Sequence, residues 1–258
     1  MKLDTVGTLF KTIVRTPQVF TGEVHFLFIL SHMRSYSTLL SHILGSHPEI
    51  QGYKERHRDY DNWLDLQRFR YHSFQEFQEL PGKYLMDKVL HFEHRIADSI
   101  FRDPQNRFLI LLRKPEQTIL SIINMGLHHD HKKKHQDPEF VLNYYRQRLQ
   151  ELITHARFLE GRAGLLHGEA LISSTEATLA SLTDWLQLGS PLKPSYQTFR
   201  DTGKEGAGDP SSTIKTGEIV QGSTSNLEQI DVPSNILAEA QRSYDSACAE
   251  LTPICQEI

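Results

Sequence analysis

Short apolar segments alternate with longer amphipathic segments along most of the chain. The run HFLFIL at residues 25–30 is apolar after its first residue, which is typical of a buried strand in a parallel sheet. Similar runs predict strands at residues 25–30, 84–86, 107–112 and 164–166. Apolar residues at helical spacing predict helices at residues 38–44, 63–77, 96–101, 115–125, 140–159, 176–188 and 233–250. Because strands alternate with helices, we expect an α/β fold of three layers with a central parallel sheet.

The chain is expected to form one domain over residues 1–258. A chain of 258 residues could also hold two small domains, but no Pro-, Gly- or Ser-rich tract interrupts its middle. Residues 190–226 are rich in Gly, Ser, Thr and Pro, which predicts long surface loops. The predicted helix at residues 233–250 follows these loops.

Composition and charge argue against several classes of protein. The formal net charge of −4 does not suit a general nucleic-acid binder, which needs a broad basic surface. No apolar run approaches the roughly 20 residues that cross a bilayer, and the first residues lack the apolar core of a secretion signal, so we expect a cytoplasmic protein without a membrane span. Residues 128–135 are rich in histidine and lysine but lack the spacing of metal ligands, so we expect a solvated loop and no metal there.

The segment directly after the first predicted strand can bind an anion. In an open parallel sheet, ligands bind at the carboxyl ends of the strands, and the N–H groups at a helix N-terminus attract negative charge. Arg34, Ser35, Ser37 and Thr38 add a cation and three hydroxyl groups at this point. Serine and threonine also cap helices, so a purely structural role stays open for this segment taken alone. Neither G-x-x-x-x-G-K-[ST] nor G-x-G-x-x-G occurs in the chain.

A second junction of the same kind follows the strand predicted at residues 107–112. Arg113 comes directly after this strand, and Ser121 lies about two turns further on in the next helix. Their side chains can meet on one phosphate if the helix leans across the site. Two such junctions on one sheet suit a ligand that carries a phosphate at each end.

These segments resemble those of the sulfotransferases. FILSHMRSYSTLLSHILGSHPEI is similar to the 5′-phosphosulfate-binding loop of that family, and FLILLRKPEQTILSIIN is similar to its 3′-phosphate-binding segment. Met86-Asp87-Lys88 resembles a family Asp-Lys element, and LLHGEALISSTEATLASLTDWLQLGSP resembles the strand, Glu-containing turn and helix that follow. The likeness covers about residues 24–192 in the family's order and is nearest to the tyrosylprotein and bacterial sulfotransferases. It implies a P-loop-like sulfotransferase fold, with 3′-phosphoadenosine 5′-phosphosulfate (PAPS) as donor, adenosine 3′,5′-bisphosphate (PAP) as product, and no metal.

The resemblance also implies which residues bind the donor. Ser35, Ser37 and Thr38, with the amides of the loop, correspond to groups that hold the 5′-phosphate, and Arg113 and Ser121 correspond to groups that hold the 3′-phosphate. An arginine fork suits two phosphate oxygens at once. The complete set of expected donor-binding residues is Arg34, Ser35, Tyr36, Ser37, Thr38, Leu39, Arg113, Ser121 and Lys215.

Three residues are implied to act in catalysis. Arg34 occupies the position of a family cation that stabilises charge on the bridging oxygen as PAP leaves. Glu55, in the segment Gly-Tyr-Lys-Glu-Arg, falls where tyrosylprotein sulfotransferases place a carboxylate that takes the proton of the acceptor. Lys215 resembles a family lysine that folds back on the donor.

Tyr36 departs from the family pattern, which usually has Gly at this position. Gly there allows the backbone to approach a phosphate closely, so we expect Tyr36 either to keep an ordinary φ or to line the acceptor site. The implied reaction is in-line sulfuryl transfer to a hydroxyl or amine of a small molecule or peptide. The alternative is a catalytically silent nucleotide-binding or interaction protein with the same fold; Arg34 and Glu55 favour the enzyme. No lysine of the Walker type follows the first strand, which disfavours a nucleotide kinase. The sequence is compatible with a homodimer.

Overall fold

The computed structural model describes residues 23–79, 82–204, 209, 213–220 and 230–258. Its centre is a six-stranded sheet in the order β2-β3-β1-β4-β5-β6, in which every neighbouring pair is parallel. The strands are β1 His25–Ser31, β2 Ile50–Gln51, β3 Tyr84–Val89, β4 Arg107–Leu112, β5 Gly164–His167 and β6 Gln256–Glu257. The expected parallel sheet is therefore confirmed, and two strands of only two residues extend its edges.

Helices cover both faces of this sheet. The α-helices are α3 Ser37–Gly45, α4 Trp63–Phe77, α5 Asp98–Arg102, α6 Pro115–His128, α7 Pro138–Leu159, α8 Ala170–Ser173, α9 Thr175–Trp185 and α10 Ser234–Leu251. Shorter 3₁₀ helices are η1 Asp130–Gln136, η2 Thr213–Thr216 and η4 Thr252–Ile254. The loop expected at residues 128–135 is thus the end of α6 followed by η1. In the described part of the chain, no helix is long and apolar enough to cross a membrane.

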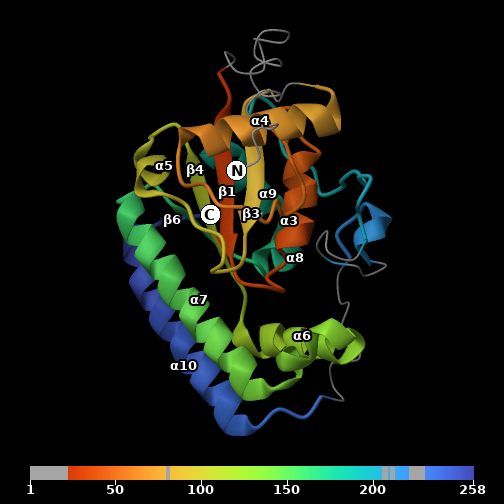
Figure 1. The fold of residues 1–258 in the computed structure, drawn as a ribbon, viewed down its shortest axis with the longest axis vertical. Helices are drawn as coiled ribbons and strands as arrows, with labels where there is room; N and C mark the ends of the chain where they lie inside the picture. Colours follow the sequence, from red (N-terminus) through yellow and green to blue (C-terminus); the bar gives the residue numbers. More distant parts are fainter. Residues whose placement is uncertain (1–22, 80–81, 205–208, 210–212, 221–229) are drawn as a thin grey trace, which may run out of the picture.

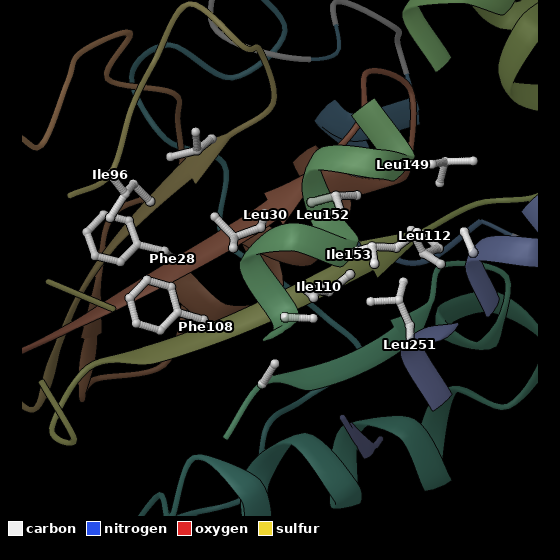
Figure 2. Close-up of a cluster of buried hydrophobic side chains, with 14 of the residues drawn as sticks. Phe28, Leu30, Ile96, Phe108, Ile110, Leu112, Leu149, Leu152, Ile153 and Leu251 are labelled. Atoms are coloured by element: carbon white, nitrogen blue, oxygen red, sulfur yellow. The ribbon is translucent and has the colours of Figure 1, made fainter. Parts of the chain in front are cut away.

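The two faces of the sheet explain why the strands are mostly apolar. Successive side chains of a strand point to opposite faces. Along β1, Phe26, Phe28 and Leu30 therefore belong to one buried cluster, and Leu27 and Ile29 belong to another. Figure 2 shows the first cluster, in which side chains of β1 and β4 pack against the inner face of α7. In Figure 1, α7 and α10 lie side by side along this face, and α6 lies beyond the carboxyl ends of the strands.

A buried arginine joins the carboxyl ends of β1 and β3. Arg148 of α7 is fully buried; its Nε donates to the carbonyl of Ser31 (2.7 Å), and its Nη2 donates to the carbonyl of Val89 (2.5 Å). Its Nη1 pairs with Glu151 on the same helix. Because these strand ends lead into the loops that carry the polar residues, Arg148 fixes where those loops begin.

Replacing Arg148 tests this role. Arg148→Met keeps much of the side-chain volume but leaves the Ser31 and Val89 carbonyls without their buried donor, so we expect the free energy of unfolding to fall by about 3 kcal/mol. The matched control is Arg146→Met, which removes an exposed ion pair with Glu239 and should cost less than about 1 kcal/mol. Urea unfolding measures both variants. Equal losses in the two variants would contradict the role given to Arg148.

Candidate active site

Buried hydrogen bonds fix the first residues of the loop between β1 and α3. Ser31 Oγ lies 2.6 Å from both the Leu111 carbonyl oxygen and Ser35 Oγ, and all three groups are buried. The side chain of Ser35 therefore faces the fold, so this residue can offer only its backbone N–H to a ligand. The first N–H groups of a helix have no partner within the helix. Those of Ser37, Thr38 and Leu39 accordingly make the start of α3 a position for an anion. The side chain of Leu39 packs against the core.

Two residues of this loop have left-handed backbone conformations. Arg34 has a φ of 61° and Tyr36 a φ of 69°. Of the two alternatives expected for Tyr36, the ordinary φ is therefore wrong, and a position that lines the acceptor site stays a prediction. A left-handed conformation is unfavourable for residues other than Gly, so neighbouring contacts must hold Tyr36 in place.

Arg113 supplies those contacts. Its guanidinium carbon lies 4.0 Å from the centre of the Tyr36 ring, and its Nη2 donates to the Tyr36 hydroxyl (3.0 Å) and to Gln117 Oε1 (2.8 Å). Its Nη1 donates to the Arg34 carbonyl (2.8 Å). Burial lowers the pKa of Arg113. The guanidinium group is thus packed against the loop, where it stabilises the conformation of Tyr36.

Arg34 connects this loop to α6. Its Nε donates to Ser121 Oγ (2.8 Å), and its Nη1 lies 3.3 Å from the carboxylate of Asp209. Arg34 and Ser121, which are 87 positions apart in the sequence, are therefore brought together. Arg113 forms no hydrogen bond with Ser121; it joins this pair by donating to the Arg34 carbonyl. The two junctions predicted to bind phosphates form one continuous site.

His32 forms a second link between the two junctions. Its Nδ1 lies 2.9 Å from the Met33 carbonyl oxygen and must therefore carry the proton, while its Nε2 accepts from the backbone N–H of Arg113 (3.1 Å). Burial lowers the pKa of His32 to about 4. The imidazole ring is accordingly neutral at pH 7, and protonation would remove the acceptor for the Arg113 N–H.

Glu55 lies among basic groups at the carboxyl end of β3. Its carboxylate oxygens are 3.9 Å from Lys88 Nζ, 3.6 Å from His91 Nε2 and 3.9 Å from His57 Nδ1. Lys88 is buried and its Nζ also lies 3.5 Å from Thr38 Oγ1, so it stands between Glu55 and the start of α3. Burial lowers the pKa of Lys88, which the charge of Glu55 partly offsets.

Lys88 was not among the site residues expected from the sequence. The signal was its position: a lysine in the strand YLMDKV, whose residues are all buried. A buried lysine needs a partner, and such groups concentrate at functional sites. The preceding residue, Asp87, accepts from the Tyr60 hydroxyl (2.6 Å) and the Arg56 N–H (2.9 Å), which fixes the segment that carries Glu55.

Among the described residues, Lys215 forms no hydrogen bond or ion pair with these site residues. It belongs to η2, its side chain is exposed, and its aliphatic chain covers Gly203, where an added Cβ would lie 2.1 Å from Lys215 Cε. Its expected role at the donor stays a prediction. Among the described residues, no group of three or more His, Cys, Asp or Glu side chains could hold a metal ion.

The arrangement defines an α/β protein with a candidate anion site at the carboxyl ends of its central strands. No protein-family model and no curated protein matches the chain. Among solved structures, the sulfotransferase domain from the curacin biosynthetic pathway is similar with a TM-score of 0.58 and 20% identity, over 86% of this chain and 97% of that one. This likeness shows that the chain has the sulfotransferase fold.

Two further solved structures are similar to this chain, with lower TM-scores. A sulfotransferase from Alicyclobacillus acidocaldarius has a TM-score of 0.49 and 13% identity, over 90% of this chain and 96% of that one. Mouse sulfotransferase SULT7A1, complexed with PAP, has a TM-score of 0.47 and 9% identity, over 93% of this chain and 88% of that one.

The environment of His32 predicts a dependence of stability on pH. Because its pKa is about 4 in the folded protein and about 6.5 when exposed, the unfolded chain takes up a proton first as the pH falls. The stability that His32 contributes is present above pH 6.5 and is lost as the pH falls through 4. We expect His32→Asn to lose about 2 kcal/mol less than the wild type between pH 7 and pH 4.5 in urea unfolding. His128→Asn, an exposed histidine of α6, should change as the wild type does, and identical pH profiles for all three proteins would refute this explanation.

Proposed function

We propose that this protein transfers a sulfuryl group from PAPS to a hydroxyl or amine acceptor. The observation that supports the proposal most is that the β1–α3 loop and the start of α6 meet through Arg34, with Glu55 and Lys88 beside the same loop. Two anion-binding junctions suit a donor with phosphates at its 3′ and 5′ positions. The sulfotransferase fold agrees with this assignment.

The 5′-phosphosulfate is proposed to lie at the N-terminus of α3. The backbone N–H groups of residues 35–39 and the hydroxyl of Thr38 would bind its oxygens. The contacts of Asp209 support this position for an anion. Its carboxylate contacts Arg34, and its backbone N–H donates to Thr38 Oγ1 (3.1 Å). In the complex, phosphate oxygens would take the place of this carboxylate on Arg34.

The 3′-phosphate is proposed to bind Ser121 and Arg113, while Arg34 serves the bridging oxygen of the 5′-phosphosulfate. Arg34 and Ser121 already lie together, and the guanidinium of Arg113 could serve a phosphate only by exchanging the Tyr36 hydroxyl or Gln117 for phosphate oxygens. The ring and hydroxyl of Tyr36 therefore keep the guanidinium group of Arg113 in position for the phosphate. Lys215 would complete the donor site if η2 moves toward α3 on binding.

Glu55 is proposed to accept the proton of the acceptor. A carboxylate that stands beside the buried Lys88 is fixed in position, and Lys88 in turn points to Thr38 at the start of α3. Lys88 can thus stabilise negative charge on the bridging oxygen as PAP leaves, in addition to Arg34. The acceptor oxygen or nitrogen would attack the sulfur in line as Glu55 takes its proton.

Binding of PAP tests the donor site. We expect PAP to bind in the presence of EDTA and to raise the melting temperature, because the site offers N–H, hydroxyl and guanidinium groups that need no metal. Ser121→Ala removes one hydroxyl and should weaken binding about tenfold in calorimetry. Ser243→Ala, a serine of α10 whose hydroxyl donates to the Glu239 carbonyl of the same helix, is the matched control and should bind as the wild type does. Absence of any thermal shift at millimolar PAP would count against the proposal.

Substitution of Glu55 tests the transfer step. Glu55→Gln keeps the size of the side chain but removes its basicity, so turnover should fall about 10²–10⁴-fold while PAP affinity stays nearly the same. The measurement uses ³⁵S-labelled PAPS with phenol, alcohol and amine acceptors. Glu93→Gln, an exposed carboxylate two residues after His91, is the control. If the Glu55 variant turned over within a few-fold of the wild type, another base would have to be sought.

A further inference from the structure

A pocket separate from the proposed donor site lies beside the segment that carries Glu55. It has a volume of about 550 Å³ and lies between residues 54–58, α4 and residues 200–201. Its lining residues are Lys54, Arg56, Arg58, His72, Gln75, Glu76, Arg200 and Asp201. Glu55 is not among them, because its side chain contacts Lys88 and His91 instead. The pocket shares no lining residue with the proposed donor site.

The pocket carries an excess of positive charge. Among the described residues that line it, four are lysine or arginine and two are carboxylates. Both carboxylates are already engaged: Glu76 pairs with Lys54 (2.8 Å) and Arg56 (2.6 Å), and Asp201 pairs with Lys54 (2.7 Å) and Lys204 (3.1 Å). These ion pairs lower the pKa of Asp201 to about 2. The positive charge of the other two arginines is therefore not neutralised from within the pocket.

Arg58 and Arg200 are those two residues. Within the described chain, no carboxylate forms an ion pair with either of them. The Nε atoms of Arg56 and Arg58 are buried without an acceptor among the described residues, so these guanidinium groups have already lost part of their hydration. An anion that binds them has less water to displace, which strengthens the attraction. The pKa of the adjacent His72 is lowered, first by burial and then by Arg58 and Arg56, as expected where the potential is positive.

We propose that this pocket binds a phosphate monoester. A phosphate monoester carries a charge of about −1.5 to −2 at neutral pH, which matches the excess of two positive charges, and its oxygens suit the forks of Arg58 and Arg200. Carboxylates and sulfate esters carry a single charge and match less well. The volume of the pocket is within the range of sites for small organic ligands and exceeds what a bare ion fills.

Such a ligand would also bear on the proposed transfer site. It would connect residues 54–58 to α4 and to residues 200–201, and residues 54–58 include Glu55. Occupation of the pocket would therefore restrict the segment that positions Glu55. The site differs from the donor site in place and in ligand, and it does not require the donor site to be occupied.

Calorimetric titration with glycerol 3-phosphate and with inorganic phosphate tests the proposal. The proteins compared are the wild type, the double variant Arg58→Gln/Arg200→Gln, Arg200→Glu alone, Arg113→Gln in the proposed donor site, and Arg242→Gln on the exposed face of α10. Arg200 is exposed, so its single substitution should fold normally even if the double variant does not. Melting temperatures of the unliganded proteins check folding.

The proposal predicts saturable binding that the double variant and Arg200→Glu weaken at least about tenfold, while Arg113→Gln and Arg242→Gln bind as the wild type does. Tighter binding of glycerol 3-phosphate than of inorganic phosphate would support a phosphate monoester as the occupant, whereas equal or weaker binding would show that the pocket takes only the bare ion and would overturn the proposal. Binding that only Arg113→Gln weakens would place the anion at the donor site and overturn the proposal while leaving the proposed function intact. No binding to the wild type at 10 mM, roughly the weakest affinity of interest, would also overturn it.

Discussion

The position of the candidate active site depends on the buried guanidinium group of Arg148. Parallel strands end in loops, and nothing in the sheet itself fixes how those loops begin. Arg148 donates to the last carbonyls of both β1 and β3, so the loop that holds Arg34 and Tyr36 starts from the same rigid point as the loop after Lys88. A guanidinium group suits this role because its planar fork presents donors in fixed directions. The contact between Thr38 and Lys88 follows from this common origin. Glu55 lies on the segment after β2 and is held beside Lys88 because the adjacent Arg56 N–H donates to Asp87.

From that origin, the anion site is assembled by groups that support one another. Arg34 and Tyr36 have left-handed backbone conformations. Arg113 stabilises both residues, because it stacks on the Tyr36 ring and donates to the Arg34 carbonyl. His32 holds the backbone of Arg113 in return. Contacts from the neighbouring strand end thus hold the strained loop in a conformation that its own sequence would not prefer.

The sequence predicted the sheet because its central strands are buried on both faces and are therefore mostly apolar. It did not predict β2 and β6, since two residues are too few to show a pattern. It pointed to the β1–α3 loop and to Arg113, because parallel strands place such residues at one edge. It could not predict the left-handed φ of Tyr36, which depends on the Arg113 side chain 77 positions away, or the contact of Arg34 with Ser121. Lys88 appeared in the sequence only in the Asp-Lys element, beyond the strand predicted at residues 84–86; the fold shows that it is buried within β3 and stands beside Glu55.

The central claim is that the two junctions bind the two phosphates of a single nucleotide. A crystal structure of the protein with PAP tests this claim most directly. We expect the 5′-phosphate against the backbone N–H groups at the start of α3, the 3′-phosphate within hydrogen-bonding distance of Arg113 and Ser121, and the Asp209 carboxylate displaced from Arg34. PAP bound elsewhere, or bound with its phosphates away from both junctions and Asp209 still on Arg34, would contradict it.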